Sequence, residues 1–273
     1  MPYTRTLLFA ALLSLGLAVV AEPISAQPTR TITRSFSLDR DGHVELEAFS
    51  GSIEVTGGDQ GGVEVEARIE GNDEELVNAT ALRFDASDRG LSIEVDYDEV
   101  EDRQQFLGLF NIGDVDRPDV DVAISMPQSA SFMVDTFSSD VEVEGLRAGA
   151  TLDAFSSSVA LRDVEGTVDI ETFSGAVESD GLRGSVRLET FSGDVQLRNA
   201  ALMGDSHFET FSGDVELFLP PDASFEVVGE EDLFGDLASE FALRAEEGRR
   251  IAGNGGPRIE VETFSGDLRL RKQ

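Results

Sequence analysis

A six-residue phrase, Thr-Phe-Ser-Gly-Asp-Val or a close variant, returns at nearly fixed intervals in this 273-residue chain. Five copies lie 18, 18, 18 and 20 residues apart, and their phenylalanines are Phe137, Phe155, Phe173, Phe191 and Phe211. Two further copies surround Phe49 and Phe264. Self-similarity at such a period is typical of repeat proteins, in which each unit buries its apolar face only against its neighbours. The chain is therefore predicted to be a stack of short repeats.

Each repeat has the pattern of two short strands joined by a corner. In Val168–Thr172 apolar residues alternate with acidic ones, the period-two pattern of a strand with one buried face. After each phenylalanine come Ser-Gly or Ser-Ser and a second short alternating run, such as Val195–Leu197. Eighteen residues are too few for a strand, a crossover helix and a second strand. The predicted fold class is all-β: a single-stranded β-solenoid (β-helix) with coils of about 18–20 residues and irregular terminal caps.

The position of the phenylalanines depends on where the corner falls. Thr172 shares strand parity with Val168 and Ile170, whereas Phe173 shares it with Val177. We therefore place the corner near Thr-Phe-Ser-Gly and expect the rings to stack in the lumen. The alternative is an external aromatic stripe that binds a ligand. The corner glycines are expected to include some with positive φ, and they are Gly175, Gly193, Gly213 and Gly266.

Residues 1–26 have the composition of a secretory signal peptide. Arg5 precedes an apolar run from Leu7 to Val20, and small residues follow, so that cleavage after Ala21 or after Ala26 is predicted. The run is too short to span a bilayer comfortably, and no second apolar stretch follows. The mature chain is thus predicted to be exported to the periplasm, the cell surface or the extracellular space, without a transmembrane span.

The remainder of the chain is divided into two regions. Residues 27–127 are predicted to form an N-terminal β region with a first, solitary coil at His43–Val55 and a long loop. A short helix is expected at Asp73–Ala79, capped by Asn72. Residues 128–273 are predicted to hold the regular β-solenoid repeats and a C-terminal capping coil.

The chain carries 54 acidic and 21 basic residues, a formal net charge of −33. This charge excludes nucleic-acid phosphates as natural partners. One acid directly precedes the Thr-Phe or Ala-Phe pair in every repeat: Glu47, Asp135, Asp153, Glu171, Glu189, Glu209 and Glu262. Strand alternation points these side chains outward, and stacking would bring like charges to about 4.8 Å.

This row of acids is the candidate metal site of the sequence. The acids of the consecutive coils could form a ladder bridged by divalent cations, and they are Asp135, Asp153, Glu171, Glu189 and Glu209. The alternative is that they only keep the solenoid soluble and deter association between strand edges. No other cofactor is predicted.

The sequence does not predict an enzyme, and it offers no catalytic residues. Asp205, Ser206 and His207 are adjacent, but neighbours on a strand point to opposite faces, with Ser206 inward and His207 outward. The two histidines, His43 and His207, fall in distant coils and make no metal site of their own. Acids occur throughout and single out no catalytic pair.

An early Phe-Ser-Gly-Ser-Ile-Glu-Val coil, serial Thr-Phe-Ser-Gly-Asp-Val repeats and a closing coil resemble the bacterial putative adhesin domain family. The resemblance covers nearly all of residues 30–271 and implies an envelope β-solenoid, with no catalytic or binding residues. The predicted function is an exported, non-enzymatic cell-envelope module for adhesion or scaffolding, with an acidic, cation-responsive face. Its partner would be a cell-surface or envelope component; the motifs specify neither that component nor the oligomeric state. The alternatives are a carbohydrate-active β-helix enzyme and a self-assembling solenoid scaffold.

Overall fold

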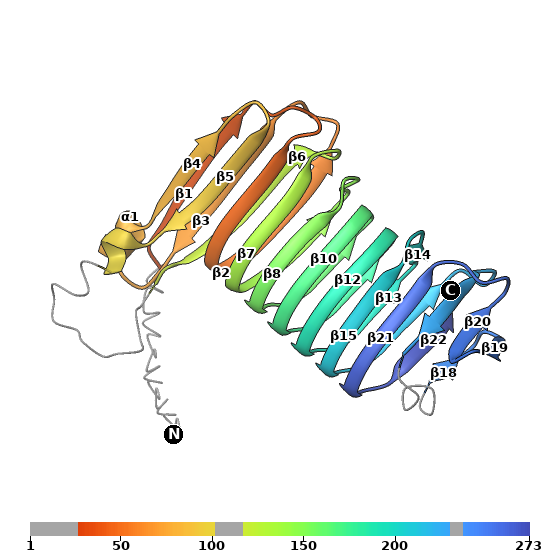
Figure 1. The fold of residues 1–273 in the computed structure, drawn as a ribbon. Helices are drawn as coiled ribbons and strands as arrows, with labels where there is room; N and C mark the ends of the chain where they lie inside the picture. The colour runs from red at the N-terminus through yellow and green to blue at the C-terminus, as the bar shows by residue number, and fades with distance from the viewer. Residues whose placement is uncertain (1–26, 102–116, 230–236) are drawn as a thin grey trace, which may run out of the picture.

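A computed structural model describes residues 27–101, 117–229 and 237–273 of the chain (Figure 1). The predicted signal peptide, residues 1–26, lies outside the described residues, as does most of the predicted long loop. Strands dominate the described residues; the helix Glu74–Ala79 is six residues long, and residues 98–101 are also helical. No helix among them is long and apolar enough to cross a bilayer.

The strands fall into three groups along the chain. The N-terminal group is β1 (Thr29–Phe36), β2 (His43–Gly58), β3 (Val63–Glu70), α1 (Glu74–Ala79), β4 (Ala81–Ala86), β5 (Gly90–Asp96) and β6 (Asp119–Pro127). The regular repeats are β7 (Ser131–Glu144), β8 (Ala150–Ser156), β9 (Val159–Arg162), β10 (Glu165–Ser174), β11 (Val177–Asp180), β12 (Arg183–Ser192), β13 (Val195–Arg198), β14 (Ala201–Leu202), β15 (Ser206–Ser212) and β16 (Val215–Leu219). The C-terminal group is β17 (Phe225–Val228), β18 (Ala238–Ser239), β19 (Leu243–Glu246), β20 (Arg249–Ala252), β21 (Arg258–Ser265) and β22 (Leu268–Lys272).

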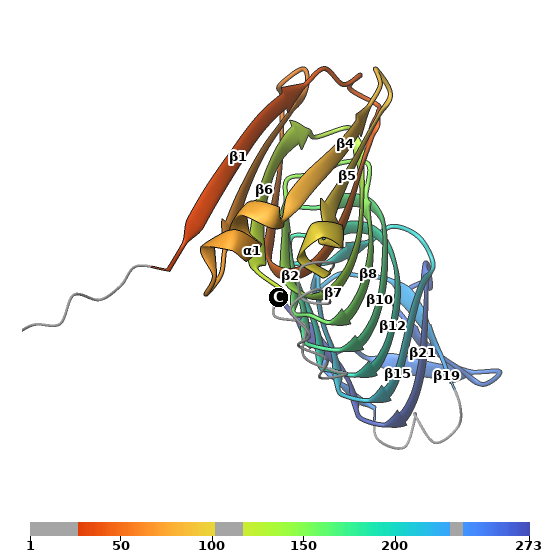
Figure 2. The ribbon, with the colours of Figure 1, turned by 90° about the vertical axis from the view of Figure 1, so that its left-hand side faces the viewer.

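Parallel pairing in register stacks each repeat on the next. Strands β7, β8, β10, β12, β15 and β21 pair successively in one row, and β7, β9, β11, β13, β16 and β22 in a second. Equivalent residues are partners, as Thr172 and Thr190 show. Figure 1 shows the repeats side by side, and Figure 2 shows them following one another behind the N-terminal strands. The chain therefore has an all-β repeat fold.

The sheet is mixed, because antiparallel strands lie at both ends of the stack. At the N-terminal end β3 pairs with β1 and β6, and β4 pairs with β5. At the C-terminal end β20 pairs with β17 and β19. These additional strands pair with the outer repeats and so cover edges that would otherwise offer unpaired peptide groups to another chain.

The first repeat is not solitary, contrary to the sequence prediction. Strand β2 pairs with β7 along its length, from His43 opposite Ser131 to Thr56 opposite Glu144. Strands β5 and β6, which lie between β2 and β7 in the sequence, also pair with β2 in parallel, so β2 has partners on both sides. The repeats at Phe49 and Phe264 thus belong to the same continuous stack as the five regular ones.

The interior of the stack consists of columns of equivalent apolar side chains. The residue before each acid is at most 2% exposed, and these residues are Leu46, Val134, Leu152, Ile170, Leu188, Phe208 and Val261. The acids themselves lie on the outer face, as the alternation predicted. Burial of a large aliphatic side chain contributes roughly 1.5–3 kcal/mol, so these columns are a main source of the stability of the stack.

The phenylalanines of the repeats lie outside the stack, so the prediction of a luminal ladder was wrong. In β10 the alternation continues without a break: Ile170 and Thr172 are buried, whereas Glu171 and Phe173 are exposed. The corner follows at Gly175, two residues after Phe173, and Val177 begins the next buried face. Because the corner falls later than expected, Phe173 is still part of strand β10. Its ring therefore points outward, as Glu171 does, and not inward as Val177 does.

The corner glycines lie between strands, as predicted, and Gly175 has a φ of 138°. A Cβ on Gly175 would lie 1.9 Å from the carbonyl oxygen of Ser157 in the preceding repeat. The aspartate of the repeated phrase also has a structural role at this corner. Carboxylates of Asp140 and Asp214 accept hydrogen bonds from the backbone N–H of Ser158 and Asp267, at 3.2 and 2.9 Å. Each such bond joins one repeat to the next.

Helix α1 forms close to its predicted place, but its cap differs from the prediction. Asp73, rather than Asn72, is the N-cap, and its carboxylate accepts a hydrogen bond from the N–H of Glu75 at 2.7 Å. Asn72 instead accepts a hydrogen bond from the side chain of Gln27 at 3.1 Å. Asn and Asp are about equally good N-cap residues, so the sequence alone did not distinguish Asn72 from Asp73.

Candidate binding groove

A row of acids runs along one outer face of the stack. The register places each acid of the predicted ladder beside the next one, and the row comprises Asp135, Asp153, Glu171, Glu189 and Glu209. Glu47 extends the row at one end and Glu262 at the other. Like charges on directly opposed residues repel each other, so the row concentrates negative potential on this face. The bridging of these acids by cations stays a prediction.

A row of phenylalanine rings runs parallel to the acids, two residues further along each strand. Neighbouring ring centroids lie 4.7–5.0 Å apart with planes inclined by at most 8°. The stacked rings belong to Phe49, Phe137, Phe155, Phe173, Phe191, Phe211 and Phe264. This separation equals the spacing between paired strands, so the backbone sets the stacking. The five central rings are 45–47% exposed, which leaves a continuous aromatic surface open to solvent.

The two rows are the walls of a groove. One section of about 710 Å³ extends from Asp153 and Phe155 to Glu262 and Phe264. A second section of about 500 Å³ continues from the same Asp153 and Phe155 toward Phe49. The residues between acid and phenylalanine have buried side chains, as at Thr190, so the floor of the groove is backbone. The acid-phenylalanine groove, as we call it, therefore runs along most of the stack.

Most of the acidic wall has no cationic partner. Among the residues that the structure describes, no ion pair involves Glu47, Asp135, Asp153, Glu171 or Glu262. Glu189 pairs with Arg187 of its own strand, and Glu209 lies near His207. The groove is thus a site of unneutralised negative charge beside exposed aromatic surface.

An arginine of the chain itself occupies the N-terminal end of the groove. The guanidinium of Arg117 lies 4.4 Å from the ring centroid of Phe49, and its Nη2 is 2.6 Å from Oε1 of Glu101. Tyr97 forms the side of this position, with its ring 5.9 Å from the same guanidinium. Burial raises the pKa of Tyr97, and its hydroxyl donates a hydrogen bond to the carbonyl of Pro118 at 3.2 Å. A cation can therefore sit against the aromatic row with a carboxylate as partner.

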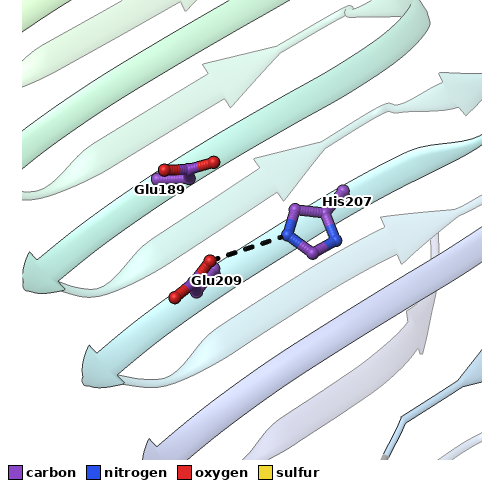
Figure 3. A group of neighbouring side chains, drawn as sticks. All are labelled: Glu189, His207 and Glu209. Atoms are coloured by element: carbon purple, nitrogen blue, oxygen red, sulfur yellow. Dashed lines mark ion pairs between the residues drawn. The ribbon is translucent and has the colours of Figure 1, made fainter.

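Acids of the groove also gather around His207 on β15 (Figure 3). Its Nε2 lies 3.8 Å from a carboxylate oxygen of Glu209, and its Nδ1 lies 3.6 Å from one of Glu260 on β21. Two groups of three ligand residues share this histidine: one adds Glu189 and Glu209, and the other adds Glu260 and Glu262. This cluster was not predicted from the sequence, where His43 and His207 were expected to lie in distant coils and to form no metal site of their own. The sequence feature that could have indicated it is Glu209, which is two residues after His207 and therefore on the same face of the strand.

The residues that resemble a hydrolytic triad are separated, as predicted. Ser206 is 3% exposed and its Oγ accepts a hydrogen bond from the backbone N–H of Val186 at 3.1 Å. His207, the next residue, lies on the outer face. The two side chains point to opposite sides of the sheet, so they do not form a nucleophile and its base.

Several solved structures resemble this chain at low sequence identity. No curated protein matches the chain. Solved structures that resemble it include a putative adhesin from Bacteroides fragilis, with 12% identity, coverage of 89% of this chain and 97% of that one, and a TM-score of 0.48. A putative cell adhesion protein from Clostridium sporogenes has 9% identity, coverage of 89% and 100%, and a TM-score of 0.35. A putative lipid binding protein from Parabacteroides distasonis has 12% identity, coverage of 88% of this chain and 96% of that one, and a TM-score of 0.39.

The family match agrees with the resemblance that the repeated motifs indicated. The model of the family described as Toastrack DUF4097 matches residues 111–271, which is more than half of the chain. The matched segment contains the regular repeats and the closing repeat β21–β22. The chain therefore belongs to the Toastrack DUF4097 family.

Proposed function

We propose that this chain is an exported, non-enzymatic adhesion module of the cell envelope, which binds an arginine-bearing segment of a surface protein in the acid-phenylalanine groove. The observation that carries the proposal is the seat of Arg117 between Phe49 and Glu101. Glu101 is not part of the acid row, but each repeat along the groove likewise presents an exposed ring beside a carboxylate, as Phe173 beside Glu171. Arginine side chains of a partner would occupy the positions that Arg117 leaves open.

The chemistry of the groove fits a guanidinium better than other groups. A guanidinium is planar, stacks on aromatic faces and donates paired hydrogen bonds to carboxylates. Each exposed cation–π contact contributes about 0.5–1 kcal/mol, so affinity requires several contacts along the row. The acids add long-range attraction, which accelerates encounter with a cationic partner. A repeating groove thus favours an extended segment with several arginines.

The repeat stack is the scaffold of this groove in our proposal. We regard it as a single-stranded β-solenoid with coils of about 18–20 residues, closed at each end by antiparallel strands. The acidic wall makes it responsive to cations, since divalent ions would bridge neighbouring carboxylates such as Glu171 and Glu189.

A carbohydrate-active enzyme is the weaker candidate. Glycosidases set two carboxyl groups in different environments, so that one is protonated and the other ionised. Among the described residues, the acids of the groove form a uniform row on a solvent-exposed face. Such a row favours multivalent binding over acid–base catalysis.

Binding of a synthetic peptide of alternating arginine and serine tests the proposal. The full mature chain would be titrated with the labelled peptide in ~150 mM NaCl and EDTA, where the Debye length is about 8 Å. The double variant Phe173→Leu/Phe191→Leu keeps the net charge but removes two aromatic faces. We expect its affinity to fall about fivefold or more, the equivalent of two lost cation–π contacts.

Matched charge variants separate groove binding from general attraction to an acidic protein. Glu171→Gln/Glu189→Gln removes two acids from the groove, and Glu144→Gln/Glu178→Gln removes two exposed acids that do not line it. The first pair should weaken binding more than the second. Equal losses from both pairs, together with unchanged affinity in the leucine variant, would contradict the proposal.

The export part of the proposal has a separate test. Expression of the whole chain in a bacterial host, followed by N-terminal sequencing of the exported product, should give a start at Glu22 or Gln27, after Ala21 or Ala26. Retention of an uncleaved chain in the cytoplasm would contradict export. Attachment of the purified mature chain to whole cells, compared with that of the leucine variant, then tests whether adhesion uses the groove.

A further inference from the structure

We infer that His207, Glu260 and Glu262 form a binding site for one divalent transition-metal ion of the zinc type, which fastens β21 to β15. These residues are one of the groups whose ligand atoms all lie within 4.8 Å of one another. His207 faces Glu260 across the parallel pair, and Glu209 faces Glu262. All four residues have the same strand parity and lie on the outer face.

The ligand atoms are close to the separation that an ion requires. Zinc binds imidazole nitrogen at about 2.0–2.1 Å and carboxylate oxygen at about 2.0–2.2 Å, so neighbouring ligands of a tetrahedral site lie roughly 3.3 Å apart. In the structure Nδ1 of His207 lies 3.6 Å from Oε2 of Glu260. Glutamate side chains are flexible, so small rotations would bring Glu260 and Glu262 onto one ion. A water molecule would complete the four ligands, as is common at open zinc sites.

The other ring nitrogen of His207 has a suitable partner. Metal-binding histidines usually donate the N–H of the second ring nitrogen to a carboxylate, which fixes the ring and makes it a better ligand. Here Nε2 lies 3.8 Å from Oε2 of Glu209, close enough for that hydrogen bond after a small movement. Glu209 would thus orient the ring while Glu260 and Glu262 bind the ion.

The opposite side of the ring is a poorer site. There Glu189 and Glu209 complete the group, but Glu189 already forms an ion pair with Arg187 on the same strand. Arg187 also faces His207 directly in the register. A metal ion on that side would lie near a fixed positive charge and would compete for a neutralised carboxylate. No ion pair involves Glu262 among the described residues, and Glu260 pairs only with His207 there.

The proposed ion would join segments that are distant in the chain. His207 and Glu260 are separated in the sequence by the segment that contains β16 to β20. A bound ion would therefore hold the last repeat, β21–β22, in its register on β15. Ligand binding to the folded state alone raises stability, so zinc should raise the melting temperature.

The zinc site shares Glu262 with the wall of the acid-phenylalanine groove and Glu209 with the acid ladder, but zinc binding requires neither peptide binding nor bridging of the ladder. Imidazole favours zinc-type ions over Mg²⁺ and Ca²⁺, which prefer oxygen ligands only. The chain has two histidines and no cysteine, so His43 is the one other imidazole and no thiolate competes for zinc. Peptide binding in EDTA and zinc binding without peptide are measured separately, so either can fail alone.

Zinc titration of the untagged full chain against a chromophoric chelator tests the site. We expect one Zn²⁺ per chain, with a Kd at least tenfold weaker in His207→Gln. The matched control is His43→Gln, the other histidine, which belongs to no such ligand group among the described residues and should stay within twofold of wild type. Glu262→Gln should weaken binding at least fivefold, whereas Glu189→Gln should change it less than twofold.

Histidine ring signals in NMR spectra of the wild-type chain give a second measurement that needs no folded variant. Zinc should shift the His207 signals and leave those of His43 unchanged, and excess Mg²⁺ or Ca²⁺ should not reverse the shift. Absence of zinc binding, or equal affinity in His207→Gln, would overturn the site. A larger loss from Glu189→Gln than from Glu262→Gln would also overturn it, because the ion would then lie on the β12 side.

Discussion

The ring of Phe173 lies parallel to that of Phe191, with 4.9 Å between centroids and 1° between planes, on the solvent-facing side of the stack. The same strand carries Ile170 in the interior. Phe173 is 47% exposed and Ile170 is 1% exposed. One strand therefore offers two large apolar side chains with different roles, one in the core and one in the groove.

This difference predicts unequal costs of truncation. Ile170→Ala should lower the free energy of unfolding by about 2–5 kcal/mol, because it leaves a cavity in the interior. Phe173→Ala should lower it by only about 1–2 kcal/mol, through the loss of ring stacking and partial burial. Denaturant melts of both variants and the wild type measure these values. A loss from Phe173→Ala as large as that from Ile170→Ala would contradict an external ring.

The row of acids predicts that salt stabilises the fold. Neighbouring carboxylates such as Glu171 and Glu189 lie on directly paired residues, where like charges repel by about 1 kcal/mol even at the dielectric constant of water. At ~1 M salt the Debye length is near 3 Å, shorter than the strand spacing of about 4.8 Å. The melting temperature should therefore rise with NaCl, and Glu171→Gln should reduce that rise.

A comparison of divalent with monovalent salts distinguishes screening of the carboxylate repulsion from bridging of the carboxylates by cations. If cations bridge the carboxylates, MgCl₂ or CaCl₂ should raise the melting temperature more than NaCl at equal ionic strength. Equal rises in all three salts would leave the repulsion in place but remove the bridged ladder. Thermal melts at matched ionic strength supply the comparison.

The corner at Gly175 predicts a strong requirement for glycine. Its φ of 138° is unfavourable for other residues, and a Cβ would lie 1.9 Å from the carbonyl oxygen of Ser157. Gly175→Ala should lower the free energy of unfolding by at least about 2 kcal/mol. Gly61, in the turn after β2, has no neighbouring atom within 4 Å of the place that a Cβ would take, and Gly61→Ala should change stability by less than about 0.5 kcal/mol. Similar losses from both substitutions would contradict the close approach.

The Asp214 carboxylate predicts part of the response to acid. The backbone N–H of Asp267, and then the guanidinium of Arg269, lower its pKa below the ordinary value of 3.8. A lowered folded-state pKa means that the unfolded chain binds a proton first as the pH falls. Asp214 therefore adds stability above about pH 3.8 that is lost as the pH falls through the folded-state value.

Asp214→Asn should thus lose less stability between neutral pH and acid than the wild type does. The matched control is Glu178→Gln, an exposed acid on β11. Urea melts at a series of pH values give the slopes. An unchanged slope for Asp214→Asn would show that the tie between β16 and β22 does not depend on this carboxylate.

The sequence was sufficient for the features that depend on local alternation. The buried column through Ile170, the outward acid at Glu171 and the inward Thr172 all follow from period-two parity within one strand. Parity also depends on where a strand ends, and a corner placed two residues too early put Phe173 on the wrong side of the sheet. No local pattern distinguishes Thr-Phe-Ser-Gly as a corner from the same residues as the end of a strand.

Contacts between strands that are distant in the sequence could not be predicted from local alternation. His207 meets Glu260 only because β21 returns to β15 after the irregular segment that contains β17 to β20. The repeat of β2 was likewise predicted to be solitary, because several strands separate β2 from β7 in the sequence although the two pair directly in space. The cap of α1 at Asp73 rather than Asn72 is a smaller case, since the two residue types cap equally well.

Register between equivalent residues also makes the length of the groove a countable quantity. Each repeat contacts only the one before and the one after, as Thr172 does between Ala154 and Thr190. A tandem duplication of residues 165–182 would therefore add one acid and one ring to the walls and lengthen the groove by about 4.8 Å. Gain or loss of a single repeat would therefore change the length of the groove in fixed steps, while the contacts between neighbouring repeats stay the same.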